Sequence, residues 1–320
     1  MGIGGRISYA RASMNVSQSS RPMIGALSDV LAALDAHVTR LTRLEAAGDW
    51  ALAFPALDRL KFVAVLRGTC WLMLPDRDPQ PMSKGDVCLI GRTGYAVASN
   101  PTLPPVDGAR LFDELGSDVL RLGGNDTVML GGGVTFAPGN PVFLLDMLPA
   151  FLLVPGRSDG AGAVANILAL LNDEAERADL GNELVSARLA DVLLIEAIRV
   201  HAGNADATGV GWLGALTDRR IGRALQSIHA DIAQPWTTAR LAGIAGMSRA
   251  AFCAEFARRV GKAPLSYVRA WRLTLARAAL ARGGSDVARV AAEVGYTSQS
   301  AFGHAFRRAF GTSPKSSTRP

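Results

Sequence analysis

The chain has 320 residues, of which 49% are hydrophobic, and a formal net charge of +6. This composition excludes a disordered tail, and the length is enough for two domains that each bury a core. The charge is unevenly divided, because residues 212–320 carry 17 Lys and Arg against 5 Asp and Glu, whereas residues 1–211 carry 17 against 23. A basic module therefore follows an acidic one, and the basic module is a candidate for binding nucleic acid.

The sequence shows no signal for export or for a membrane span. Residues 1–22 are rich in Ser, Gly and Arg and lack a continuous apolar region, so we expect a flexible N-terminus. The most apolar stretch, residues 141–155, is interrupted by Asp146 and Pro149 and is too short to cross a bilayer. Three cysteines without a CxxC pair indicate a reducing compartment. We therefore expect a cytoplasmic protein with no membrane partner.

Residues 23–201 are predicted to form strands flanked by helices. Between residues 24 and 45 the apolar side chains recur at three- and four-residue steps, which predicts a helix; they are Leu27, Leu31, Leu34, Val38 and Leu41. Short β-type runs separated by Gly, Pro and Asp follow at residues 62–66, 69–74, 86–90, 95–98 and 127–136. Such runs suit a small barrel or a double-sheet jelly roll. Two helices are predicted after them, at about 163–178 and 183–201.

The helix at 183–201 carries more apolar surface than one face of a small barrel needs. Two interpretations are open: the helix packs on its own barrel, or it forms a homodimer interface. Residues 202–211 are polar and contain glycine, which is typical of a linker. The chain is thus divided into a domain at 23–201 and a second domain at 212–320.

The last third of the chain contains one pattern twice. The first copy is Leu241, Ala245, Gly246, Ser248, Phe252, Phe256, Gly261 and Pro264, and the second is Val290, Val294, Gly295, Ser298, Phe302, Phe306, Gly311 and Pro314. In each copy a glycine ends a short helix, a Ser or Thr hydroxyl caps the next helix, and phenylalanines bury one face of it. The repeat predicts two DNA-reading helix-turn-helix units, at about 237–260 and 287–310.

The phenylalanines of each second helix aim the opposite face at DNA, since successive residues turn by about 100°. We predict contacts to base edges from Gln299, Ser300, His304, Arg249 and Cys253, and contacts to phosphate from Ser248, Arg258, Ser298, Arg307 and Arg308. The second unit offers far more hydrogen-bonding groups than the first. Small residues such as Ala250 and Ala254 suit the first unit to apolar contacts in the groove.

Residues 212–320 resemble the DNA-binding domain of the AraC/XylS family of bacterial transcription regulators. The resemblance rests on the repeat, on the Gly295-Tyr296 turn, and on residues 264–280, which look like the helix that joins the two units in that family. Residues 23–201 are similar to the cupin domain that precedes this module in one branch of the family, in their strand order and in the Gly85-Asp86 turn.

The resemblance implies an α+β protein of two domains, an N-terminal cupin-like β-barrel with flanking helices and a C-terminal all-α double helix-turn-helix. It also implies the partners: double-stranded DNA, a small-molecule effector, a second copy of the chain through residues 183–201, and RNA polymerase if the protein is an activator. The sequence does not separate activation from repression.

Three roles are open for the cupin-like domain. Trp71, Met73 and Tyr95 are candidates for the lining of an effector pocket, although core packing also explains them. Cys70 and Cys88 lie on strands that look adjacent and suggest a redox sensor, although buried thiols are commonly inert.

The third role is a metal-dependent cupin enzyme, which would need histidines and a carboxylate converging on a metal. The four histidines, His37, His201, His229 and His304, all lie outside the predicted strands. We therefore predict no metal, no other cofactor and no enzymatic activity. The overall prediction is a sequence-specific transcription regulator.

Overall fold

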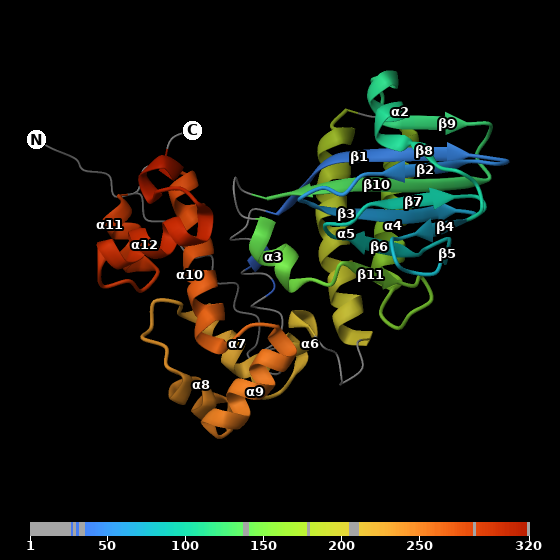
Figure 1. The fold of residues 1–320 in the computed structure, drawn as a ribbon. Helices are drawn as coiled ribbons and strands as arrows, with labels where there is room; N and C mark the ends of the chain where they lie inside the picture. Colours follow the sequence, from blue (N-terminus) through green and yellow to red (C-terminus); the bar gives the residue numbers. More distant parts are fainter. Residues whose placement is uncertain are drawn as a thin grey trace, which may run out of the picture.

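The computed structural model describes residues 27, 30–31, 36–136, 141–177, 180–204, 211–283 and 286–318. A sheet-rich N-terminal domain and an all-helical C-terminal domain lie side by side, and a short helix, α3 (Pro141–Met147), lies between them (Figure 1). The α+β class and the two-domain order are as predicted. The described strands form two sheets that do not close into a barrel, so the predicted barrel is replaced by the double-sheet form.

The larger sheet has six strands in the order β11-β6-β3-β10-β1-β9, and the smaller has five in the order β5-β4-β7-β2-β8. The strands are β1 (His37–Ala46), β2 (Ala51–Phe54), β3 (Leu60–Arg67), β4 (Thr69–Met73), β5 (Gln80–Ser83), β6 (Val87–Ile90), β7 (Tyr95–Ala98), β8 (Val106–Asp107), β9 (Val119–Leu122), β10 (Thr127–Thr135) and β11 (Phe151–Val154). Because alternate residues of a strand point to opposite faces, Leu44, Val63 and Met129 meet Leu72 and Val97 between the sheets.

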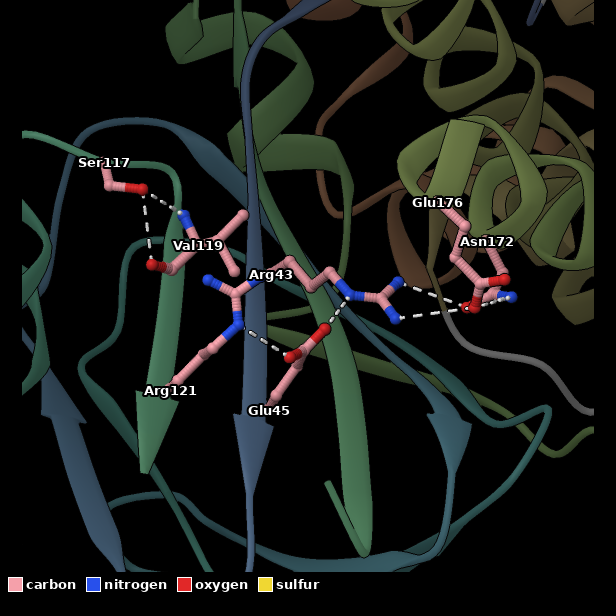
Figure 2. A network of polar contacts seen from close by, with 7 residues as sticks. All are labelled: Arg43, Glu45, Ser117, Val119, Arg121, Asn172 and Glu176. Atoms are coloured by element: carbon pink, nitrogen blue, oxygen red, sulfur yellow. Dashed lines mark hydrogen bonds and ion pairs between the residues drawn. The ribbon is translucent and has the colours of Figure 1, made fainter. Parts of the chain in front are cut away.

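Helices α4 (Gly162–Arg177) and α5 (Asn182–Asn204) cover the other face of the six-stranded sheet (Figure 1). A polar network, shown in Figure 2, joins the edge of this sheet to α4. Arg43 donates to Glu45 at 2.8 Å and to Asn172 of α4 at 3.1 Å, and Arg121 of β9 donates to Glu45 at 3.0 Å. The hydrogen bond from Arg43 lowers the pKa of the Glu45 carboxyl below its usual value. A short helix, α2 (Gly108–Leu115), packs on β2 and β9.

The prediction of one helix over residues 24–45 is wrong for its second half. Leu27, Val30 and Leu31 are helical, but His37–Ala46 is strand β1, paired with β10 and β9. An irregularity between Val38 and Arg40 shifts the register of the β1–β10 pair. The shift interrupts the two-residue alternation of a strand, and so imitates the three-residue steps of a helix. His37 therefore lies in the strand region, contrary to our prediction.

The other predicted strands and the two helices after them are confirmed to within a few residues. Helix α5 continues to Asn204, into the predicted linker, of which residues 205–210 lie outside the described residues. The predicted flexible segment 1–22 also lies outside them.

The C-terminal domain contains the two predicted helix-turn-helix units. Its helices are α6 (Trp212–Thr217), α7 (Ile221–Ala230), α8 (Thr238–Ala245), α9 (Arg249–Val260), α10 (Pro264–Ala281), α11 (Val287–Glu293) and α12 (Gln299–Phe310), followed by a 3-10 turn, η1 (Pro314–Thr318). Helices α8 and α9 form the first unit and α11 and α12 the second, and they lie at opposite ends of α10 (Figure 1).

The turns are built as the sequence indicates. Gly246 ends α8 with φ +65°, and Gly295 lies in the second turn with φ +84°, where an added Cβ would be 2.6 Å from a backbone oxygen of Ala233. The hydroxyls of Ser248 and Ser298 accept from backbone amides at the start of α9 and α12, each at 3.3 Å. The N-cap of α12 is Ser298, the serine of the second copy of the repeat.

Helix α3 joins the domains through a buried aromatic cluster. The ring of Phe143 lies 5.1 Å from that of Trp271 and 5.6 Å from that of Tyr267. The Tyr267 hydroxyl accepts from Trp212 Nε1 at 2.9 Å and lies 2.7 Å from Nε2 of His229. Burial lowers the pKa of His229 to about 3. The histidine is therefore neutral in the folded protein, and its Nε2 shares a hydrogen bond with the tyrosine hydroxyl.

An ionic contact lies beside this cluster. Asp146 of α3 pairs with Arg92 of the β6–β7 loop at 2.9 Å and with Lys262, between α9 and α10, at 3.3 Å. A single helix thus contacts both a loop of the sheet domain and the DNA-binding module.

Candidate functional site

Helix α12 presents a polar face to solvent. Phe302 and Phe306 are fully buried against α10 and α11, and Phe310, one turn further on, is half-buried. The predicted contact residues on the opposite side are exposed; they are Gln299, Ser300, His304, Arg307 and Arg308. Among the described residues, no ion pair engages Arg307 or Arg308. Both cations are therefore available to an external anion.

Helix α9 is built in the same way, but arginines near its C-terminal end are paired with a carboxylate. Arg249 is exposed at its start and Cys253 is half-buried. Arg258 is exposed, but it donates to both oxygens of Glu255, at 2.7 and 2.9 Å, and Arg259 donates to the same carboxylate. These bonds lower the pKa of Glu255 to about 2, so the carboxylate stays ionised beside both arginines. The same position in α12, fifty residues on, is Ala305.

Sequence reasoning missed the residue that ties the two units together. Arg272, in the middle of α10, donates to the backbone oxygens of Ile232 at 3.1 Å, Gln234 at 2.6 Å and Gly295 at 3.2 Å. The first two oxygens precede the first unit and the third belongs to the turn of the second unit. An arginine within the apolar pattern of the joining helix was the only sequence signal for this role.

The N-terminal domain contains a cavity of about 240 Å³ between its two sheets. Apolar side chains form most of its wall, including Leu44, Leu52, Phe54, Val97, Phe112 and Met129. Gly131 and Gly133 of β10 contribute no side chain to the wall, which widens the cavity between β1 and β3. The exposed side chains of Leu57 and Arg59 lie at its mouth.

The structure separates the three predicted pocket residues. Tyr95 lines the cavity and stacks on Phe54 with ring centroids 4.9 Å apart. Trp71 and Met73 do not line it, because on β4 the residues that point between the sheets are Cys70 and Leu72. The prediction was wrong for these two because the sequence alone does not show which alternate residues of β4 point between the sheets.

Cys70 and Cys88 do not lie on adjacent strands. Strand β4 belongs to the five-stranded sheet and β6 to the six-stranded sheet, and both thiols are buried in the core between the sheets. Both are free. Burial raises the pKa of Cys70 to about 12 and that of Cys88 well above its usual value. Neither thiol is therefore ionised at neutral pH, and the thiolate is the reactive form.

The histidines are dispersed. His37 lies on β1 with its Nε2 3.3 Å from the Thr135 hydroxyl, His201 is on α5, His229 is in the aromatic cluster and His304 is on α12. Within the described ranges, no group of three or more His, Cys, Asp and Glu side chains is arranged to hold a metal ion. In the same ranges no helix is both long and apolar enough to span a membrane.

Comparison with known proteins identifies both domains. Residues 25–203 match the family model described as cupin, and residues 241–319 match the one described as helix-turn-helix domain. A putative AraC-like transcription regulator of Streptomyces lividans is 36% identical over 291 residues, which are 90% of this chain and 96% of that protein.

Two further proteins are similar to this chain. The HTH-type transcriptional regulator AlkR of Acinetobacter baylyi is 29% identical over 299 residues, covering 91% of this chain and 97% of that protein. The DNA-binding domain of AdpA, solved in complex with a target DNA, is 27% identical with a TM-score of 0.30, covering 31% of this chain and 89% of that one.

A cupin domain followed by paired helix-turn-helix units defines a DNA-binding transcription regulator. The chain belongs to the family of AraC-like transcription regulators.

Proposed function

We propose that the protein is a cytoplasmic regulator that reads specific DNA mainly through α12 and responds to a small effector bound between the two sheets. The observation that carries the first part is the difference in ion pairing between the two recognition helices. Arg307 and Arg308 of α12 are free of carboxylates among the described residues, whereas Arg258 of α9 is paired with Glu255, which it shares with Arg259.

On α12 the base-reading groups are Gln299, Ser300 and His304, and Arg307 and Arg308 contact phosphate. On α9 Arg249 and Cys253 face base edges and Arg258 faces phosphate. The hydroxyls of Ser248 and Ser298 serve first as helix caps, and each retains a hydrogen to donate to a phosphate.

The cavity supports the effector part of the proposal, and a chain of contacts leads from it to the DNA-binding module. Lys61, in the cavity wall, donates to the backbone oxygen of Thr93 at 2.9 Å. The preceding residue, Arg92, pairs with Asp146 of α3, which pairs with Lys262. A ligand that moves the β6–β7 loop would therefore change the contact between α3 and the DNA-binding module.

Helix α5 supports a homodimer. Leu184, Val185 and Val192 are 63%, 44% and 45% exposed, which is unusual for apolar side chains on one helix. A second copy of this helix would cover them, which is one of the two interpretations left open for residues 183–201. RNA polymerase is a further partner if the protein activates transcription.

The test begins with sequencing of the genomic DNA fragments that the full-length protein retains, followed by a reporter driven by the recovered promoter. Gly133→Leu fills the cavity, because the added Cβ meets only the flexible side chain of Arg59 at 3.3 Å. Gly203→Leu makes the same change on an exposed helix end with no atom within 4 Å and is the matched control. We expect Gly133→Leu to bind the operator and lose the response to growth conditions, while the control keeps it. A full response from Gly133→Leu would refute the cavity as the effector site.

A further inference from the structure

The cavity contains a buried lysine without a carboxylate partner. Lys61 is 6% exposed, and its Nζ donates to the backbone oxygens of Pro55 at 3.0 Å and Thr93 at 2.9 Å. The same atom lies 4.8 Å from the centre of the Tyr95 ring. Among the described residues it makes no ion pair. Two neutral oxygens and a ring face stabilise the ammonium group only in part, because a buried charge is costly without an opposite charge.

A second cation converges on the same cavity. Arg59 lies at the mouth, and its positive charge adds to the effect of burial in lowering the pKa of Lys61 to about 8. Arg40 also lines the cavity, but it is paired with Asp113 at 3.1 Å and Asp118 at 2.7 Å. The only carboxylate in the described wall is that of Asp113, so three cations face one anion. Two positive charges at Lys61 and Arg59 are left uncompensated.

The rest of the wall is apolar and sets the size of the ligand. The volume of about 240 Å³ exceeds the roughly 150 Å³ cavity that accepts benzene in a protein core. Phe54 and Tyr95 stack beside Lys61 and offer a flat aromatic surface. The wall therefore suits an apolar body larger than one ring, with its charged group at the lysine.

We infer that the effector is an apolar organic monoacid whose anionic group binds Lys61 and Arg59 and whose hydrocarbon body fills the space between the sheets. This inference rests on the proposed function and specifies its ligand. The anion provides the missing counter-charge, and it replaces water around two cations in a low-dielectric site, where such a pair is stronger than in bulk water.

The test compares three compounds with the same body and different heads: 4-phenylbutanoate, 4-phenylbutan-1-ol and 4-phenylbutylamine. Binding to the full-length protein is measured by isothermal titration calorimetry. We expect the acid to bind at least about tenfold more tightly than the alcohol, and the amine not to bind, since a charged hydrogen bond contributes more than a neutral one.

Two variants assign the difference to the named residues. Lys61→Met keeps the length of the side chain and removes the charge, and we expect the affinity for the acid to fall by roughly 10- to 100-fold while that for the alcohol changes little. The Arg59 side chain is exposed, so Arg59→Met leaves the core intact. It should lower the affinity for the acid by a smaller factor than Lys61→Met does. Lys84→Met and Arg67→Met, exposed and outside the cavity wall, are the matched controls.

The outcomes separate the inference from the proposed function. Equal binding of acid and alcohol, preference for the amine, or binding of none of the three would overturn the monoacid assignment. An acid preference that survives Lys61→Met and Arg59→Met would overturn it as well. None of these results alters the reporter response of Gly133→Leu, which alone decides whether the cavity holds the effector.

Discussion

We expect the first recognition helix to be restrained by a single carboxylate, and Glu255→Ala tests this. Glu255 binds Arg258 through both oxygens, at 2.7 and 2.9 Å, so this carboxylate competes with a DNA phosphate for the arginine. The second unit has Ala305 at this position and an unpaired Arg308 among the described residues. The substitution therefore gives the first unit the residue of the second.

The expected gain follows from counterion release. One additional phosphate contact makes the slope of log K against log salt steeper by about 0.9. At a physiological ionic strength of about 0.15 M this corresponds to roughly a fivefold increase in affinity. Contacts to phosphate carry no sequence information, so operator and scrambled DNA should gain equally.

The assay is fluorescence anisotropy of full-length protein with labelled operator and scrambled duplexes over a range of salt concentrations. Glu293→Ala is the matched control, because it removes an exposed carboxylate paired with the exposed Arg289 of α11 and changes the net charge by the same amount. An unchanged slope in Glu255→Ala, or an equal gain in Glu293→Ala, would refute the reasoning.

Three further predictions concern other parts of the molecule. Replacing Ser300 and His304 together by Ala should relax base preference under α12, by about 1–3 kcal/mol for each good hydrogen bond to a base that is removed, without changing the salt slope; competition with operators mutated one base pair at a time measures this, and a uniform weakening over all sequences would contradict it. Because burial lowers the pKa of His229 to about 3, the unfolded chain binds a proton below pH 6.5 that the folded chain does not. The free energy of unfolding should therefore fall between about pH 6.5 and 3, by about 2 kcal/mol from pH 7 to pH 5. Urea unfolding of His229→Asn should lack this part of the decrease, whereas the control, His304→Ala, should retain it. Protein with Ser at both Cys70 and Cys88 should keep its regulatory response in cells, since burial disfavours both thiolates; loss of a response to oxidant in a variant that still folds and binds DNA would show the opposite.

The sequence alone determined the DNA-binding module, because its signals are local. A glycine at each turn, a serine cap three residues before a bonded amide, and phenylalanines at helical spacing act within one or two turns of chain. Their effect is therefore readable without knowing what lies elsewhere. For the same reason the predicted faces of α9 and α12 agree with the observed exposure of Arg249, Ser300 and His304.

The tertiary structure decided what depends on partners distant in sequence. Strand β1 is a strand because it pairs with β10, nearly ninety residues away, and this pairing overrides a local pattern that resembles a helix. The phase of β4 and the meeting of the two sheets decide that Tyr95 and Lys61 face the cavity, whereas Trp71 does not. A cavity is the space left between elements, so no segment of the sequence encodes it by itself.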